Sequence, residues 1–137
     1  MKKQALITGA TSGIGRATAL RLAAEGYDIT ATGRRAERLE TLRREIEAAG
    51  GRCTALVFDV RSEAEVRKFL SPLERVDLLI NNAGLAAGLE HIDQGDTADW
   101  DAMIDTNVKG LLYVTRVVTP KMVAAGGGHV FNIGSIA

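Results

Sequence analysis

The sequence predicts an α/β fold built on a doubly wound parallel sheet. Short apolar runs that suit strands alternate with segments of helical period along the whole chain. A glycine-rich turn joins the first apolar run to the first helix, and no repeat or low-complexity linker interrupts the alternation. Strands separated by helices require right-handed crossovers, which place the strands parallel in one sheet.

The strands and helices are predicted in the same order along the chain. The strands are expected at residues 5–7, 28–32, 53–58, 76–80 and 129–133. The helices are expected at residues 16–25, 36–49 and 63–70, with a further helix starting at Asp96 and a long one over residues 105–124. The third strand is a continuous apolar run, which suggests a strand covered on both faces.

Apolar residues at helical spacing predict the buried side of each helix. In the second helix this side carries Leu39, Leu42 and Ile46, while Glu40 and Arg44 form an i,i+4 pair facing solvent. In the first helix the expected stripe is Ile14, Ala17, Leu20 and Ala24.

Composition excludes several classes of function. The 137 residues suit one domain, and the formal net charge of zero gives no electrostatic footprint for nucleic acid or an anionic membrane. No apolar run approaches the length of a membrane span and no signal peptide opens the chain, so a cytoplasmic protein is expected. A single cysteine, Cys53, and two isolated histidines suggest neither a disulfide nor a metal site.

The glycine turn, residues 8–15, has the composition of a phosphate-binding loop. Gly9, Gly13 and Gly15 follow a strand and precede a helix, whose free N–H groups and dipole favour a pyrophosphate. The spacing Gly-x3-Gly-x-Gly differs from the commonest dinucleotide fingerprint, and a plain strand-to-helix turn is the alternative. Polar residues recur after the later strands, at Arg34, Asp59, Asn81 and Ser135, where open parallel sheets bind ligands.

These motifs resemble those of the short-chain dehydrogenase/reductase family. The resemblance rests on Gly9-x3-Gly13-Ile14-Gly15, Asn81-Asn82-Ala83-Gly84, Asn107 and Ser135, and within the family the chain is similar to NADP-dependent 3-hydroxy acid and serine dehydrogenases. It implies a Rossmann fold of strand order 3-2-1-4-5 over residues 1–137. It also implies coenzyme contacts at Gly9, Ala10, Thr11, Ser12, Gly13, Ile14, Asp59, Val60 and Asn82.

The end of the second strand predicts NADP rather than NAD. NAD sites place a carboxylate here for the ribose, whereas this chain has Gly33, Arg34 and Arg35. A guanidinium bond to the 2′-phosphate contributes about 1.5–3 kcal/mol, or about tenfold to a hundredfold in preference. Alternatively, both arginines belong to the solvated first turn of the next helix.

The catalytic residues match the family only in part. The resemblance implies a tyrosine, a serine, a lysine and an asparagine acting on a small alcohol or carbonyl substrate; Asn107 and Ser135 fit two of these roles. The Tyr-x3-Lys pair is missing, because Ala31 follows Tyr27 and Val117 follows Tyr113 at the required distance. The expected protein is therefore a truncated dehydrogenase that lacks its C-terminal strands and has little turnover.

Truncation predicts homo-oligomers or aggregation. Residues 129–133 would form an open sheet edge, and the long helix would present Leu112, Val114 and Val118 with fewer partners. Two other functions stay open, a non-catalytic NADP-binding module and a methyltransferase-like domain, the latter disfavoured because Gly33 and Arg34 replace an acidic ribose ligand.

Overall fold

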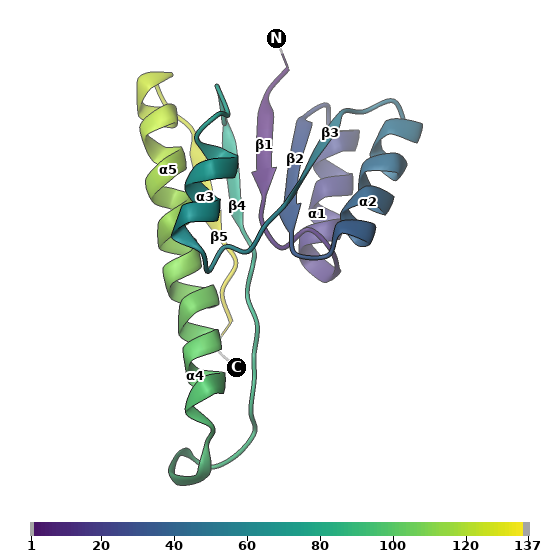
Figure 1. Cartoon of the computed structure of the whole chain (residues 1–137). Coiled ribbons are helices and arrows are strands. Elements are labelled where there is room, and N and C mark those ends of the chain that lie inside the picture. Colours follow the sequence, from purple (N-terminus) through teal and green to yellow (C-terminus); the bar gives the residue numbers. More distant parts are fainter. Residues whose placement is uncertain (1, 136–137) are drawn as a thin grey trace.

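A parallel five-stranded sheet with helices on both faces forms the core of the computed structural model, which describes residues 2–135 (Figure 1). The strands lie in the order β3-β2-β1-β4-β5, which confirms the predicted Rossmann topology. Residues at matching positions pair in register, such as Ile7 with Ala31 on one side and with Ile80 on the other. The strands are β1 (Gln4–Ile7), β2 (Asp28–Gly33), β3 (Cys53–Val57), β4 (Leu78–Asn81) and β5 (His129–Asn132).

The helices lie between the strands as the sequence predicts. Gly26, with φ of 97°, follows the first helix at the C′ position, where a glycine favours this conformation. Ser62 caps the third, its hydroxyl accepting from the Glu65 N–H at 3.2 Å, while the Glu65 carboxylate accepts from the Asp59 N–H instead of completing a capping box. The helices are α1 (Gly13–Ala24), α2 (Ala36–Ala48), α3 (Glu63–Leu70), α4 (Thr97–Ile104) and α5 (Leu111–Ala124), with a 3₁₀ turn η1 (Ile92–Gln94) and a π-helical segment η2 (Asp105–Gly110).

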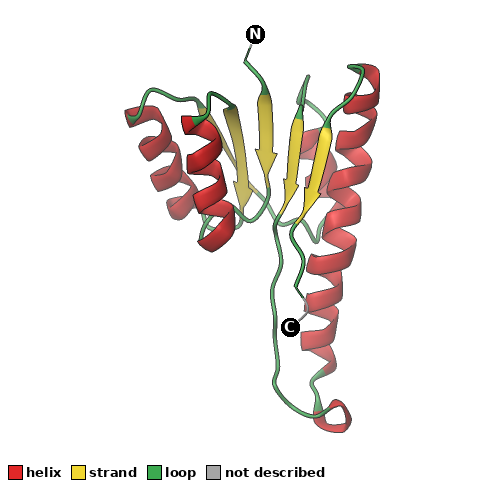
Figure 2. Ribbon diagram, turned by 180° about the vertical axis from the view of Figure 1, so that it is seen from behind, coloured by secondary structure: helices red, strands yellow, loops and turns green. Residues whose placement is uncertain are grey.

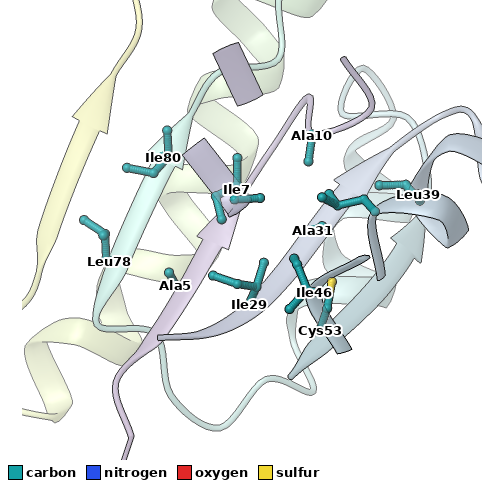
Figure 3. Close-up of a cluster of buried hydrophobic side chains, with 12 residues drawn as sticks. Ala5, Ile7, Ala10, Ile29, Ala31, Leu39, Ile46, Cys53, Leu78 and Ile80 are labelled. Atoms are coloured by element: carbon teal, nitrogen blue, oxygen red, sulfur yellow. The ribbon is translucent and has the colours of Figure 1, made fainter. Parts of the chain in front are cut away.

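Alternation along the strands divides the core into two layers. Ala5 and Ile7 of β1 lie in one buried cluster with Leu39 and Ile46 of α2, on the face of the sheet that α1 and α2 cover (Figure 3). Leu6 points the other way, into a cluster with Val66 of α3 and residues of α5. Each layer contains fully buried aliphatic side chains, so the sheet is covered from both sides around its central strands.

Two burial predictions for these elements are wrong. In α1 the buried residues are Gly15 and Ala19, while Ile14 is exposed, so the expected stripe does not face the sheet. Its two arginines and one threonine lie on different sides of the helix instead of one polar face, and its smallest residues allow the closest approach to the strands. In β3 Thr54 and Val57 are exposed because β3 is an edge strand of the sheet, which has a neighbour on one side.

The segment after β4 projects far beyond the sheet. Residues 82–110, called the arm below, run away from the strand ends and return as α4 and η2, which continue into α5 (Figures 1 and 2). Only Thr106 and Gly110 of the arm are buried, and Leu89 and Ile92 are among its exposed apolar side chains. The arm carries six acidic residues, Glu90, Asp93, Asp96, Asp99, Asp101 and Asp105, and no Lys or Arg before Lys109.

Part of the prediction for the long helix is wrong. Val114 and Val118 are buried against the sheet, whereas Leu112 is exposed as expected. Strand β5 forms an exposed edge of the described sheet, as expected, with Phe131 on its surface. No helix in residues 2–135 is both long and apolar enough to span a bilayer.

Candidate functional site: a cavity at the carboxyl ends of the strands

A cavity of about 300 Å³ lies where the strands β1 to β4 end. This is the edge of a parallel sheet at which ligands bind. The turns after β1, β2, β3 and β4 all contribute to its wall, and η2 closes it through Thr106. The lining residues are Gly9, Thr11, Ser12, Ile14, Thr32, Gly33, Arg34, Arg35, Phe58, Asp59, Val60, Asn82, Ala83, Gly84, Leu85 and Thr106.

The glycines of the first turn allow two loops to touch. Gly9 has a φ of 63°, and a Cβ added there would lie 2.8 Å from the Ala83 Cα atom. A Cβ on Gly15 would overlap the Gly9 carbonyl oxygen and the Asn82 amide nitrogen. The third glycine of the motif therefore brings α1 against the turn that leaves β1.

The start of α1 offers free hydrogen-bond donors to the cavity. The N-cap residue Ser12 makes no side-chain capping bond, so it leaves the first N–H groups of the helix to other acceptors. Ser12 and Thr11 also line the cavity. Uncapped N–H groups and the positive end of a helix dipole together form an anion site.

Hydrogen bonds join the turn after β1 to the turn after β4. The Thr8 hydroxyl accepts from the backbone N–H groups of Asn82 and Ala83, both at 3.0 Å. The Asn82 side-chain amide donates to the Gly9 carbonyl oxygen at 3.0 Å. Because these groups are partly buried and paired, the two turns form one rigid wall of the cavity.

The opposite wall carries opposite charges. Arg34 and Arg35 follow β2 and are exposed, and no carboxylate follows them before Glu37 of α2. Asp59, after β3, lies 3.9 Å from the Arg34 guanidinium. Burial alone raises the pKa of the Asp59 carboxyl, but hydrogen bonds from Arg61 and the charges of Arg61 and Arg34 together hold that pKa below its usual value.

Asn107 lies in η2 and forms hydrogen bonds with Leu85, in the part of the arm that leaves β4. Its side-chain oxygen accepts from the Leu85 N–H and its amide donates to the Leu85 carbonyl, each at 2.8 Å. This pair of bonds fixes the loop that leaves β4 against η2. Ser135 follows β5 and is exposed, and neither residue is part of the cavity lining.

The cavity brings together most, though not all, of the residues predicted to bind coenzyme. Ala10 lies outside the lining, since its side chain is buried and its N–H donates to the Thr32 carbonyl at 3.0 Å, and Gly13 also lies outside it. Sequence reasoning missed Thr32, Phe58, Leu85 and Thr106. Phe58 and Thr32 adjoin predicted residues and could have been found by extending each motif by one position, whereas Thr106 reaches the cavity only through the path of the arm. The predicted residues in the lining are Gly9, Thr11, Ser12, Ile14, Arg34, Arg35, Asp59, Val60 and Asn82.

A glycine turn at an uncapped helix N-terminus, set in a 3-2-1-4-5 parallel sheet, defines the nucleotide-binding class of doubly wound proteins. Comparison with known proteins narrows the class. The model of the short chain dehydrogenase family matches residues 3–137, and the chain belongs to that family. The resemblance found in the sequence is thereby confirmed.

Relatives and solved structures agree with this assignment. The NADP-dependent 3-hydroxy acid dehydrogenase YdfG of Salmonella typhi is 45% identical over 136 residues, which cover 96% of this chain and 54% of that protein. The closed form of a serine dehydrogenase complexed with NADP⁺ superposes with a TM-score of 0.90 at 43% identity, covering 97% of this chain and 54% of the other. An NAD⁺-bound xylitol dehydrogenase superposes with a TM-score of 0.94 at 32% identity, covering 98% and 54%. This chain thus spans about half the length of the curated relatives it matches.

Proposed function

We propose that this chain is the coenzyme-binding part of an NADP-dependent oxidoreductase that interconverts an alcohol and a carbonyl. The observation that carries the proposal is the exposed Arg34 at the end of β2, on a cavity whose other wall is the uncapped start of α1. The substrate class we propose is a 3-hydroxy acid or a serine-like compound, supported by the relatives' names. A cytoplasmic location belongs to the same proposal.

The residues in the cavity fit the coenzyme. The N–H groups at the start of α1 would hold the diphosphate, next to Gly9, Thr11 and Ser12. Arg34 and Arg35 would bind the 2′-phosphate, since a guanidinium matches the geometry of a phosphate. The proposed adenine and ribose contacts are Asp59, Val60 and Asn82, all in the cavity wall.

Solved relatives bind either NADP⁺ or NAD⁺, so the fold leaves the choice of coenzyme to local residues. A carboxylate after β2 would repel a 2′-phosphate, and this chain has two cations there. This charge difference supports NADP.

Catalysis needs more than the cavity supplies. A bound nicotinamide accepts or donates the hydride, and the chain's part is to orient it and to move a proton. Ser135 is proposed to orient the substrate oxygen, and Asn107 to belong to the proton path. Since the sequence contains no Tyr-x3-Lys pair, the general acid is missing, which lowers the rate by about 10² to 10⁴. We therefore expect the 137-residue chain to bind NADP with almost no turnover.

Titration calorimetry with NADP, NAD and S-adenosylmethionine tests the proposal. We expect the tightest binding for NADP, and a loss of about tenfold or more in Arg34→Ala. Arg21→Ala is the matched control, because Arg21 is exposed in the last turn of α1, at the other end of that helix from the cavity. Unchanged NADP affinity in Arg34→Ala would remove this arginine from the site, and preferred binding of S-adenosylmethionine would contradict the proposal.

A non-catalytic NADP-binding module is the second candidate, supported by the missing Tyr-x3-Lys pair. It predicts the same NADP binding. It also predicts no hydride transfer when this chain is fused to the remaining sequence of a relative. Absorbance at the wavelength of reduced nicotinamide, with 3-hydroxy acids as substrates, distinguishes the two. Turnover by the 137-residue chain alone would point to a base that the sequence does not reveal.

A further inference from the structure

A carboxylate stands beside Arg34, the residue that the proposed function assigns to the 2′-phosphate. Asp59 lines the cavity next to Arg34, at 3.9 Å between the nearest charged atoms. An unpaired carboxylate here would act twice against NADP. It would repel the phosphate, and it would draw the Arg34 guanidinium into an ion pair that competes with the phosphate.

The Asp59 carboxylate is already occupied by a different arginine. The backbone N–H and the Nε atom of Arg61 donate to its Oδ1 atom at 2.9 and 3.2 Å. The Nε and Nη2 atoms of Arg61 donate to its Oδ2 atom at 2.9 and 2.7 Å. This two-pronged geometry is the strongest that an arginine and a carboxylate form.

Arg34 is held far more loosely than Arg61. Its contact with Asp59 is about 1 Å longer than those of Arg61, and 56% of its side chain is exposed compared with 37% for Arg61. Arg61 lies outside the cavity lining, whereas Arg34 is part of it. The two arginines therefore share one carboxylate unequally, and the one that faces the cavity remains available.

We propose that Arg61 is a positioning residue that sets the preference for NADP over NAD, by neutralising Asp59 and leaving Arg34 to the 2′-phosphate. The inference rests on the proposed function. It requires no direct contact between Arg61 and the coenzyme. NADP and NAD share the adenine and ribose that Asp59 is proposed to contact, so the ratio of their affinities reports the effect on the 2′-phosphate.

The test compares dissociation constants of NADP and NAD for the wild type, Arg61→Ala and Arg61→Lys. We expect Arg61→Ala to lower the ratio of NADP to NAD affinity by about tenfold, and Arg61→Lys to restore part of it, since a lysine keeps the charge without the fork. Arg67→Ala is the control, because Arg67 makes an ion pair with Glu63 at 2.8 Å on the exposed face of α3. It should leave the ratio unchanged.

A double-mutant cycle separates this role from a structural one. In an Asp59→Asn background there is no carboxylate to neutralise, so adding Arg61→Ala should change the ratio less than about twofold. A structural role for Arg61 would lower NADP and NAD affinity together and would not depend on Asp59. Circular dichroism verifies that each variant is folded, and should Arg61→Ala not fold, Arg61→Lys and Asp59→Asn carry the test.

Each outcome decides one question. If the wild type binds NADP but Arg61→Ala and Arg61→Lys keep its preference, the inference is wrong and the proposed function stands. An equal effect of Arg61→Ala with and without the Asp59 carboxylate also overturns the inference. If the wild type binds no NADP, the proposed function itself fails.

Discussion

The β1–β3 half of the molecule and the arm differ in how they use apolar residues. In the half built from β1–β3, α1 and α2, aliphatic side chains such as Ile7, Leu39 and Ile46 are buried in one cluster. In the arm, Leu89 is fully exposed and Ile104 is half exposed, and acidic residues lie between them. The β1–β3 half gains its stability from its own packing. The exposed apolar side chains of the arm instead form a surface typical of contact with another molecule.

The largest effect on the β1–β3 half is expected for Gly15→Ala. The new Cβ would overlap backbone at Gly9 and the amide of Asn82, so it should lower the free energy of unfolding by about 1–3 kcal/mol and weaken NADP binding. Urea unfolding measures the first effect and calorimetry the second. Ala17→Ser, exposed on the same helix, should stay within about 0.5 kcal/mol of wild type. Wild-type stability and binding in Gly15→Ala would show that the two turns can separate.

The arm and the exposed start of α5 should control association. We expect the wild type to form oligomers, and Ile104→Lys with Leu112→Lys to reduce its mass in light scattering, because both side chains are exposed. Val118→Ala gives the opposite pattern: it should cost about 2 kcal/mol of stability, since Val118 is fully buried, and leave association unchanged. A monomeric wild type would contradict the prediction of a homo-oligomer.

The smallest predicted effect is the loss of folding stability that protonation of the Asp59 carboxylate causes in acid. Its pKa is lowered in the folded protein, so its pairing stabilises the fold above the unfolded pKa of about 4 and loses that effect as the pH falls further. The stability difference between wild type and Asp59→Asn should therefore be present at pH 6 and shrink below pH 4. A difference that does not change between pH 6 and pH 3 would mean that Arg61 and Arg34 do not act on this carboxyl.

Local signals predicted the fold well and the burial of single elements less well. Glycine spacing, apolar runs and strand-end polar residues are features of short segments, so strand order and turns followed from them and from the family resemblance. The stripe on α1 was wrong because a helix whose few polar residues lie on different sides has no clear apolar period. The prediction that β3 is covered on both faces was wrong because β3 lies at the edge of the sheet. Edge position depends on strand order, which the apolar run of β3 does not encode.

The residues of the candidate site were also predicted only where a local motif contains them. Residues within the motifs, such as Gly9, Arg34 and Asn82, were found because each motif has its own spacing. Thr106 was missed because it reaches the cavity from η2, and the bonds between Asn107 and Leu85 depend on how the arm folds back. Arg61 was also missed as a partner of Asp59, since its importance comes from a competing arginine that follows a different strand.

The acidic residues of the arm also have an electrostatic consequence. Between residues 82 and 108 the chain carries a formal charge of −6, so with a total of zero the remaining residues carry +6. The molecule is thus a strong dipole whose negative pole lies on the projecting segment (Figure 2). A polyanionic ligand is repelled from that pole and guided toward the sheet. The arms of two molecules repel each other because both are negative, and added salt weakens this repulsion by screening the charges.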